Sequence, residues 1–214
     1  MSKDDILENI IGDLTDDLSE VKPLRHPLLR IFPWLVSAIV YTALVLGLFV
    51  GVRYDLTDKI GELPYLGELL FCFAISLCAA TGSAYLSVPD SCGKKILSYL
   101  PIGGFLALCA YYTIVTFEGG LDLPPFEWHH CVQDGLLMVG IPVIVMIVIM
   151  RKGATTHPVL MAVNNIIATG LLGWIGLRMT CGADDIGHLF LYHFMPFMVL
   201  GIIMMIFAKW LYKW

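Results

Sequence analysis

Two cysteines and the polar residues beside them are the strongest candidates for chemistry in this sequence. Cys131 and Cys181 lie at the ends of two long apolar segments, next to imidazole and carboxylate groups. Those groups are His129, His130, His188, Asp184 and Asp185. Thiolate and imidazole together suit zinc, copper and similar ions, although the spacing here matches no standard zinc motif. We therefore predict sensing at Cys131 and Cys181, with His130 as the candidate third ligand of a transient metal ion.

Other interpretations of these residues stay open at this level. Cys131 and Cys181 could form a static structural disulfide, or remain unpaired as small apolar side chains. The neighbouring histidines could hydrogen-bond at an interface instead of binding an ion, and His188 is then only a supporting residue. The remaining thiols, of Cys72, Cys78 and Cys109 in apolar segments and of Cys92 in a loop, are expected to have no part in the site.

The segments that carry the two cysteines are predicted to be antiparallel neighbours. A short loop, 151–157, joins the apolar segment that begins near Cys131 to the one that ends near Cys181. Each cysteine is about 20 residues from that loop, so at about 1.5 Å per residue both reach a similar height. A disulfide would need Cα atoms within about 7 Å, a condition that the sequence permits.

Two charged residues lie one helical turn inside the cysteines. Asp134 follows Cys131 by three residues and Arg178 precedes Cys181 by three, so each shares a helical face with its cysteine. Charged residues within a membrane span normally have a partner or a function. We therefore predict an ion pair between Asp134 and Arg178 beneath the two sulfurs.

Three further polar residues lie deeper in apolar segments. We expect His193 to be a hydrogen-bonded residue of a helix bundle, and Asn164 and Asn165 to bond across helices. Small residues at every fourth position predict close helix packing, because they let backbones approach. They form two rows, Ser76, Ala80 and Ala84 in one segment and Gly103 and Ala107 in the next.

The composition shows what must position these residues. Hydrophobic residues make up 58% of the 214 residues and charged residues 14%, where soluble domains carry about 25% charged residues. A soluble globular fold is therefore excluded. Six segments are long and apolar enough to cross a bilayer, and no ten-residue alternation typical of membrane barrels is present. We predict an all-α integral membrane bundle of six spans, at 31–52, 66–88, 96–117, 132–150, 158–180 and 187–208.

The basic residues predict the orientation of this bundle. Ten Lys and Arg residues fall on the side of the two termini and three fall on the other side. Because cytoplasmic loops are rich in Lys and Arg, both termini should be cytoplasmic in a multi-pass protein of a bacterial inner membrane. The loops at 53–65, 118–131 and 179–187 would then face outward, into an oxidising compartment.

The N-terminal tail carries the net charge of the protein. The formal charge is −5, of which residues 1–20 contribute −6 and the remaining 194 residues contribute +1. An apolar stripe at four- and three-residue spacing predicts an amphipathic helix over 4–21, and the other face carries most of the acids. The chain therefore divides into a cytoplasmic helix, 1–22, a linker, 23–30, and the membrane bundle, 31–214.

Three roles are open to this tail. A solvated tail is possible, because isolated helices of this length are marginal in water. Binding along a membrane surface is disfavoured, because the inner leaflet is anionic and repels acids. Docking into a groove of a basic partner uses both faces of the helix, with the apolar stripe for affinity and the acids for steering. The predicted docking residues are Leu7, Ile11, Asp13, Leu14, Asp16, Asp17 and Leu18. The negative charge disfavours direct binding of nucleic acid.

Several motifs in this order resemble one membrane-protein family over nearly the whole chain. They are the acidic N-terminal helix, the approach 25–30 to the first span, Leu-Ser-Val-Pro at 86–89, His130-Cys131, Arg151-Lys152-Gly153-Ala154, Met179-Thr180-Cys181 with Asp184-Asp185, and the His193-centred start of the last span. The sequence resembles the NrsF family, negative regulators of sigma F, which are membrane-embedded anti-sigma factors. The resemblance implies that the N-terminus binds an extracytoplasmic-function sigma factor. It also implies that Cys131 and Cys181 respond to metal ions or oxidants and release it.

The competing class of function is enzymatic or transport. A membrane thiol oxidoreductase would normally use a CxxC pair with a low-pKa thiol, and the sequence has none. A haem protein needs axial ligands at membrane depth, where only His193 is near. A small transporter would often carry charged midplane residues or internal repeats. We therefore expect a regulator that is not an enzyme and has no cofactor beyond a transient metal ion.

Overall fold

The computed structural model describes residues 26–88, 95–118 and 129–213, and these residues are helical with no strand among them. The predicted tail helix, 1–22, lies outside the described residues. The first span begins at Pro27, earlier than predicted, because proline is favoured in the first turn of a helix and the imidazole of His26 accepts a hydrogen bond from Leu28 N–H there. The helices are α2 (Pro27–Val45), η1 (Leu46–Val50), α3 (Leu56–Gly61), α4 (Leu63–Leu86), α5 (Lys95–Glu118), α6 (His130–Arg151), α7 (Pro158–Thr180), α8 (Ile186–His188), η3 (Leu189–Phe194), α9 (Met195–Ile206) and α10 (Ala208–Leu211).

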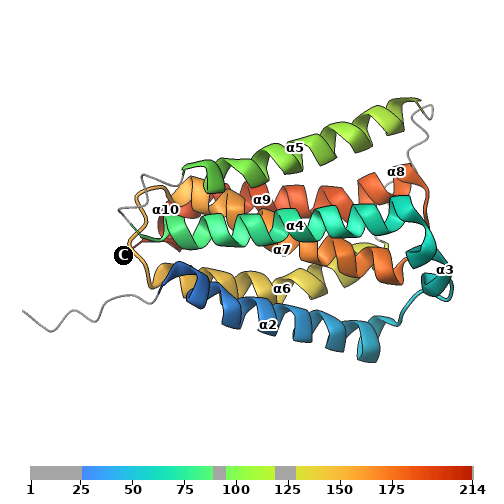
Figure 1. The fold of residues 1–214 in the computed structure, drawn as a ribbon, viewed down its shortest axis with the longest axis horizontal. Coiled ribbons are helices and arrows are strands. Elements are labelled where there is room, and N and C mark those ends of the chain that lie inside the picture. The colour runs from blue at the N-terminus through green and yellow to red at the C-terminus, as the bar shows by residue number, and fades with distance from the viewer. Residues whose placement is uncertain (1–25, 89–94, 119–128, 214) are drawn as a thin grey trace, which may run out of the picture.

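Six helical spans are long and apolar enough to cross a membrane, which confirms the predicted fold class. Two of them are composite, because α2 continues into η1, and α8, η3 and α9 run on as one helix. Their bounds are Pro27–Val50, Leu63–Leu86, Ile96–Glu118, His130–Arg151, Pro158–Thr180 and Ile186–Ile206. Consecutive spans run in opposite directions (Figure 1), so α2 begins and α10 ends at the same end of the bundle. We name this the terminal end, and name the opposite end, which carries α3, the sensor end.

Helix α7 lies at the centre of the bundle and packs against α4, α5, α6 and α9. Buried residues fill 72% of its most apolar stretch, against 17% for α5, which leans away from the other spans (Figure 1). Close packing depends on glycine at Gly173, where a Cβ would approach Val139 of α6 to 2.3 Å. The central helix therefore holds its ends in fixed positions relative to these four neighbours.

The predicted small-residue row of α4 lies in this packed interior, whereas the row of α5 does not. Ser76, Ala80 and Ala84 are fully buried, and the Ser76 hydroxyl donates to Ala168 O of α7 at 2.6 Å. Gly103 and Ala107 are exposed, so the predicted close packing at that face of α5 is wrong. Spacing alone does not distinguish a face that packs on protein from one that meets lipid.

The two asparagines of α7 bond across helices as predicted. Asn164 Nδ2 donates to Ser98 O of α5 at 3.1 Å. Asn165 Nδ2 donates to the Tyr212 hydroxyl at 2.5 Å, and its amide oxygen accepts a hydrogen bond from Ser83 of α4. These bonds tie α7 to its neighbours at the terminal end.

Two short π-helical segments interrupt the spans at the sensor end. The first, η1, ends at Gly51, whose φ of 85° lies in the left-handed region that glycine adopts without strain. The second, η3, buries three successive residues, Tyr192, His193 and Phe194. Because a π turn holds one more residue than an α turn, it changes which side chains face the core, and such turns are frequent at functional sites.

Candidate functional site

The two cysteines singled out from the sequence meet at the sensor end. Cys131 lies in the first turn of α6, and Cys181 directly follows α7. Their sulfur atoms are 3.4 Å apart, and both residues are free thiols. The predicted proximity of the cysteines is thus confirmed, and it results from the antiparallel packing of α6 on α7.

Backbone caps fix both cysteines. His129 accepts a hydrogen bond from Cys131 N–H at its Nδ1, at 3.3 Å, and so caps the start of α6. Cys181 N–H donates to Leu177 O at 2.8 Å, as the last bond of α7. Because the thiol of Cys131 donates a hydrogen bond to the sulfur of Cys181, it lowers the pKa of Cys181 below the ordinary value. This hydrogen bond favours the thiolate form of Cys181, and the thiolate is the form of cysteine that binds metal ions.

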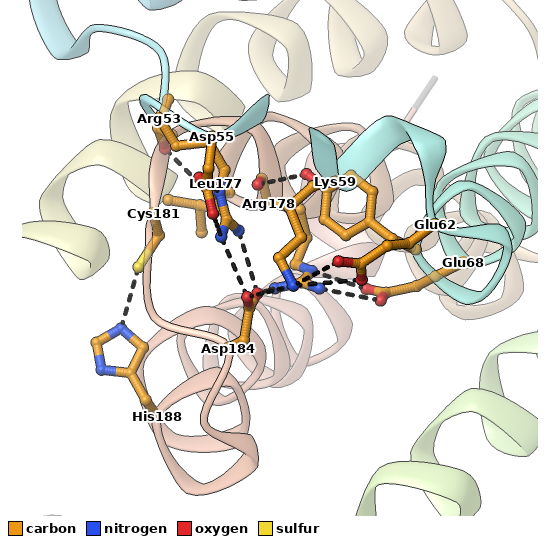
Figure 2. A network of polar contacts seen from close by, with 12 residues as sticks. Arg53, Asp55, Lys59, Glu62, Glu68, Leu177, Arg178, Cys181, Asp184 and His188 are labelled. Atoms are coloured by element: carbon orange, nitrogen blue, oxygen red, sulfur yellow. Dashed lines mark hydrogen bonds and ion pairs between the residues drawn. The ribbon is translucent and has the colours of Figure 1, made fainter. Parts of the chain in front are cut away.

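His188 completes a triangle with the two sulfurs. Its Nε2 lies 3.4 Å from the sulfur of Cys181 (Figure 2) and 3.5 Å from that of Cys131. Asp185 fixes this position, because its carboxylate accepts a hydrogen bond from His188 N–H at 2.9 Å and caps α8. Around a tetrahedral zinc-sized ion, sulfur and nitrogen ligands lie about 3.5 to 3.8 Å from one another. The triangle therefore fits the geometry of a bound ion closely.

His193 is the fourth member of this group. The side chain is fully buried in η3, and neither ring nitrogen has a hydrogen-bond partner among the described residues. One ligand atom from each of Cys131, Cys181, His188 and His193 lies within 4.8 Å of the other three. The expectation that His193 is a hydrogen-bonded bundle residue is wrong, because the π turn points it at the thiols. A buried imidazole without a partner is costly unless a ligand or proton donor reaches it. We call these four residues the thiol–imidazole cluster.

His130, the histidine chosen from the sequence as a third ligand, lies outside this cluster. It is exposed at the start of α6. Adjacent positions on a helix point about 100° apart, so Cys131 turns inward while His130 turns outward. His188, expected only as a supporting residue, takes the place that the sequence assigned to His130.

The predicted ion pair between Asp134 and Arg178 does not form. Arg178 instead bonds to Asp184 at 2.9 Å and pairs with Glu68 of α4 at 3.2 Å. Asp134 is half-buried on α6 and makes no ion pair in the described part of the chain. The guanidinium of Arg178 extends toward α4 rather than toward α6. The indole N–H of Trp174 also donates a hydrogen bond to the Glu68 carboxylate, at 2.8 Å.

Asp184 lies at the centre of an ion-pair network at the sensor end (Figure 2). Its carboxylate accepts two hydrogen bonds from Arg53, both at 3.1 Å, one from Arg178, and pairs with Lys59 at 3.1 Å. Hydrogen bonds from Arg53, then Lys59 and Arg178, lower the pKa of this carboxyl well below its usual range. The same bonds, together with those to Asp55, raise the pKa of Arg53. The network therefore holds three cations and their acids in fixed charge states at neutral pH.

Comparison with known proteins identifies the family. The family model described as NrsF, negative regulator of sigma F, matches residues 14–214. The chain belongs to the NrsF family. Searches of curated proteins and of solved structures give no match. Membership makes the chain a negative regulator with a sigma factor as its partner, and confirms the resemblance seen in the sequence. The six apolar helices agree with a multi-pass membrane protein of this NrsF family.

Sequence reasoning missed three residues of this site in the NrsF chain. His193 was hidden because helical periodicity does not reveal a π turn. Glu68 and Arg53 were hidden because their partners lie 110 and 131 residues away in the chain. One signal was available for Glu68, since a carboxylate inside an apolar segment normally has a partner or a function.

Proposed function

We propose that this protein is an anti-sigma factor of the inner membrane that releases its sigma factor when the thiol–imidazole cluster binds a metal ion. The observation that carries the proposal is the triangle formed by the sulfurs of Cys131 and Cys181 and Nε2 of His188, with edges of 3.4 to 3.5 Å. His193 supplies a fourth ligand atom within 4.8 Å. Two sulfurs and two nitrogens favour soft or borderline ions, such as zinc, cadmium or copper(I).

The N-terminal tail is the proposed site of sigma-factor binding. Residues 1–20 carry a charge of −6 and an amphipathic pattern, which suits a helical partner whose DNA- and polymerase-facing surfaces are basic. The tail is separated from α2 by only a few residues of the sequence, so a change in the position of that helix would be carried to the tail through the chain. We propose an extracytoplasmic-function sigma factor as the partner, held away from RNA polymerase while it is bound.

The distribution of charge supports an orientation with both termini in the cytoplasm. The terminal end exposes Arg151, Lys152, Lys209 and Lys213, whereas Arg53 and Arg178 at the sensor end are buried in ion pairs. Exposed bases mark the cytoplasmic face. The thiol–imidazole cluster would then face the periplasm, where metal ions and oxidants arrive first. We propose a regulator rather than an enzyme, with no cofactor beyond the sensed ion.

An oxidant is a second candidate signal, favoured by the distance of 3.4 Å between the two sulfurs. Small side-chain rotations would bring them into bonding distance, which is about 2.05 Å. An oxidant that takes up two electrons would then convert the two thiols into a disulfide, with loss of two protons. Both signals act on the same two residues, so replacing both cysteines should remove the response to either signal.

The sensing half is tested by replacing both cysteines with serine. Cys131→Ser with Cys181→Ser should leave sigma-dependent transcription repressed and abolish its induction by cadmium, because two of the four ligands are lost. The matched control replaces Cys78 and Cys109, two free thiols outside the cluster, and should retain full induction. Induction that persists in the first variant and equals the control would contradict sensing at this site.

The binding half is tested by charge reversal in the tail. Replacing Asp13, Asp16 and Asp17 with lysine in the full-length protein should release the sigma factor, because the acids that steer docking are inverted. Co-purification of the sigma factor from detergent extracts measures binding. Reversal of Asp58, an exposed acid of α3 at the sensor end, serves as the control. Equal retention by the two variants would rule out docking through the acidic face.

A further inference from the structure

Hydrogen bonds link the helix that carries the tail to the helices around it. Helix α2 is bonded to the rest of the bundle along its length. Near the terminal end the Arg30 guanidinium donates to the Ser87 hydroxyl at 2.7 Å and to Ile149 O at 3.0 Å. Farther along, Trp34 N–H donates to Pro142 O of α6 at 3.0 Å, and Tyr41 donates to Leu137 O at 2.9 Å.

At the sensor end, η1 packs against α7, and Arg53 in the loop after this span bonds to the segment that follows α7. The side chain is only 1% exposed, and it bonds to Asp184 through two nitrogens, at 3.1 Å each. Its other side-chain bonds go to Asp55, two residues along the same loop, and so hold nothing distant. The backbone N–H of Arg53 also donates to Met179 O at 3.0 Å. Asp184 is therefore the acidic side chain that attaches this end of α2 to the segment after α7.

Asp184 lies between two ligands of the cluster. Cys181 precedes it by three residues and His188 follows it by four, and residues 181–185 between α7 and α8 are not helical. A Cβ added at Gly182 in this segment would meet no atom within 4 Å. A displacement of Cys181 or His188 is thus carried to Asp184 through a few backbone bonds.

Ion binding draws His193 and the other three ligands together. The edges among Cys131, Cys181 and His188 are already 3.4 to 3.5 Å, so the spread of 4.8 Å lies between this triangle and His193. Ligand atoms around a tetrahedral zinc-sized ion are about 3.5 to 3.8 Å apart, so the triangle and His193 must approach by about 1 Å, and Cys181 and His188 move in that contraction. Charged hydrogen bonds near 3 Å weaken steeply with such shifts and with the change of angle that accompanies them.

We infer that Asp184 is the coupling residue of the sensor: its bonds to Arg53 hold α2 in the arrangement that sequesters the sigma factor, and ion binding at the cluster breaks them. This inference rests on the proposed function. It gives the ion-pair network a regulatory role, in addition to its effects on the membrane orientation and stability of the protein. A ligand shifts an equilibrium between two states only if it binds one state better than the other. Here the two states are the sequestering arrangement, in which Asp184 is bonded to Arg53, and the ion-bound arrangement, in which these bonds are broken.

The test is Asp184→Asn in the full-length protein, with sigma-dependent transcription measured without and with added cadmium chloride. The amide keeps the size of the side chain and removes its charge. Transcription without cadmium should rise by about 5- to 150-fold, the usual range of coupling between two sites, up to the induced level of the wild type. Cadmium should then add little, and the purified variant should still bind one cadmium ion per chain, with an affinity raised by the same factor, because coupling between two sites is reciprocal.

The matched control is Glu62→Gln, which removes a carboxylate of the same network whose one side-chain partner among the described residues is Lys59. It should leave both transcription levels as in the wild type. A merely unfolded protein would also release the sigma factor, so cadmium binding and the amount of protein in the membrane fraction identify a folded variant. If Asp184→Asn is folded and remains repressed and fully inducible, the inference is wrong.

A second variant decides the matter if Asp184→Asn does not accumulate. Arg53→Lys keeps the positive charge and removes the two-pronged bonding to Asp184, because an ammonium has no planar fork. It should raise transcription without cadmium, by less than the first variant does, and a wild-type level would overturn the inference. Failure of the proposed function is recognised separately, since the wild type itself would then show no induction by cadmium.

Discussion

Asn165 of α7 and His193 of η3 are two buried polar residues at opposite ends of the bundle. They differ in whether their hydrogen-bonding atoms have partners. At the terminal end, Asn165 donates to Tyr212 and accepts from Ser83, so both ends of its amide are satisfied. At the sensor end, His193 is equally buried, yet neither nitrogen has a partner in the described part of the chain. A satisfied group needs nothing further, whereas an unsatisfied one remains available to a ligand.

The difference also concerns the chemistry of the groups. Amide and hydroxyl groups are neutral and bond to one another, which ties three helices together. Thiols and imidazoles bond weakly to each other but bind soft metal ions strongly. Burial of a polar side chain in this bundle is therefore not by itself a sign of function. Asn164 Oδ1 is also without a partner among the described residues, so what marks the sensor end is an unpartnered group that lies among other metal-binding side chains.

The largest expected effect follows from His193→Phe. The change removes a ligand but fills the same space, so cadmium affinity should fall by about 100-fold or more, since even the outer partners of metal ligands cost 10- to 100-fold. The thermal midpoint of the protein in detergent should stay the same or rise, because an unpartnered buried polar group is removed. Unchanged cadmium affinity would show that His193 is not a ligand.

The opposite result is expected for Asn165→Leu. The change leaves the hydroxyls of Ser83 and Tyr212 without their amide partner, so the free energy of unfolding should fall by about 1 to 2 kcal/mol. Thermal unfolding in detergent measures the loss. Cadmium affinity should match that of the wild type. A loss of affinity in this variant would contradict the claim that Asn165 is structural and His193 is a ligand.

A smaller effect is expected from acid. Because the pKa of Asp184 is lowered in the folded state, its ion pairs stabilise the protein above the ordinary aspartate pKa of about 3.9, and this stability is lost as the pH falls further through the folded-state pKa. The difference in thermal midpoint between the wild type and Asp184→Asn should therefore be largest at neutral pH and narrow in acid. A difference that does not change with pH would exclude a charged Asp184 as its source.

The smallest effect, none at all, is expected from His130→Ala. His130 is exposed and lies outside the thiol–imidazole cluster, so cadmium affinity and induction should both match the wild type. Isothermal titration with cadmium checks the first and reporter transcription the second. Reduced affinity would show that His130 is a ligand, together with Cys131 and Cys181, as the sequence alone suggests.

The sequence predicts the architecture well because the bilayer imposes it. Apolar runs of about 20 residues reveal each span, and a short loop between the fourth and fifth spans places Cys131 beside Cys181. The asparagines of α7 were predicted as cross-helix donors on the same reasoning, since a polar group within a span needs a partner. These features depend on the local sequence pattern and on the apolar surroundings of a span, and both can be inferred from the sequence.

The composition of the site depends instead on distant geometry. His193 joins the cluster through a π turn, which leaves no mark in a 3.6-residue period. Arg178 pairs with Glu68 and not with Asp134, because the direction of a long side chain is set by packing across three helices. Helical spacing correctly grouped residues on one face, but it could not tell which neighbouring helix that face meets.

The central claim is that the thiol–imidazole cluster binds the ion that the protein senses. The most direct measurement is titration of the purified full-length protein in detergent with cadmium chloride, followed by the ultraviolet charge-transfer absorbance of cadmium–thiolate bonds. One ion per chain should bind to the wild type, and the absorbance should disappear when Cys131 and Cys181 are both serine. The variant that lacks Cys78 and Cys109 should match the wild type. Equal binding and absorbance with or without Cys131 and Cys181 would contradict the account.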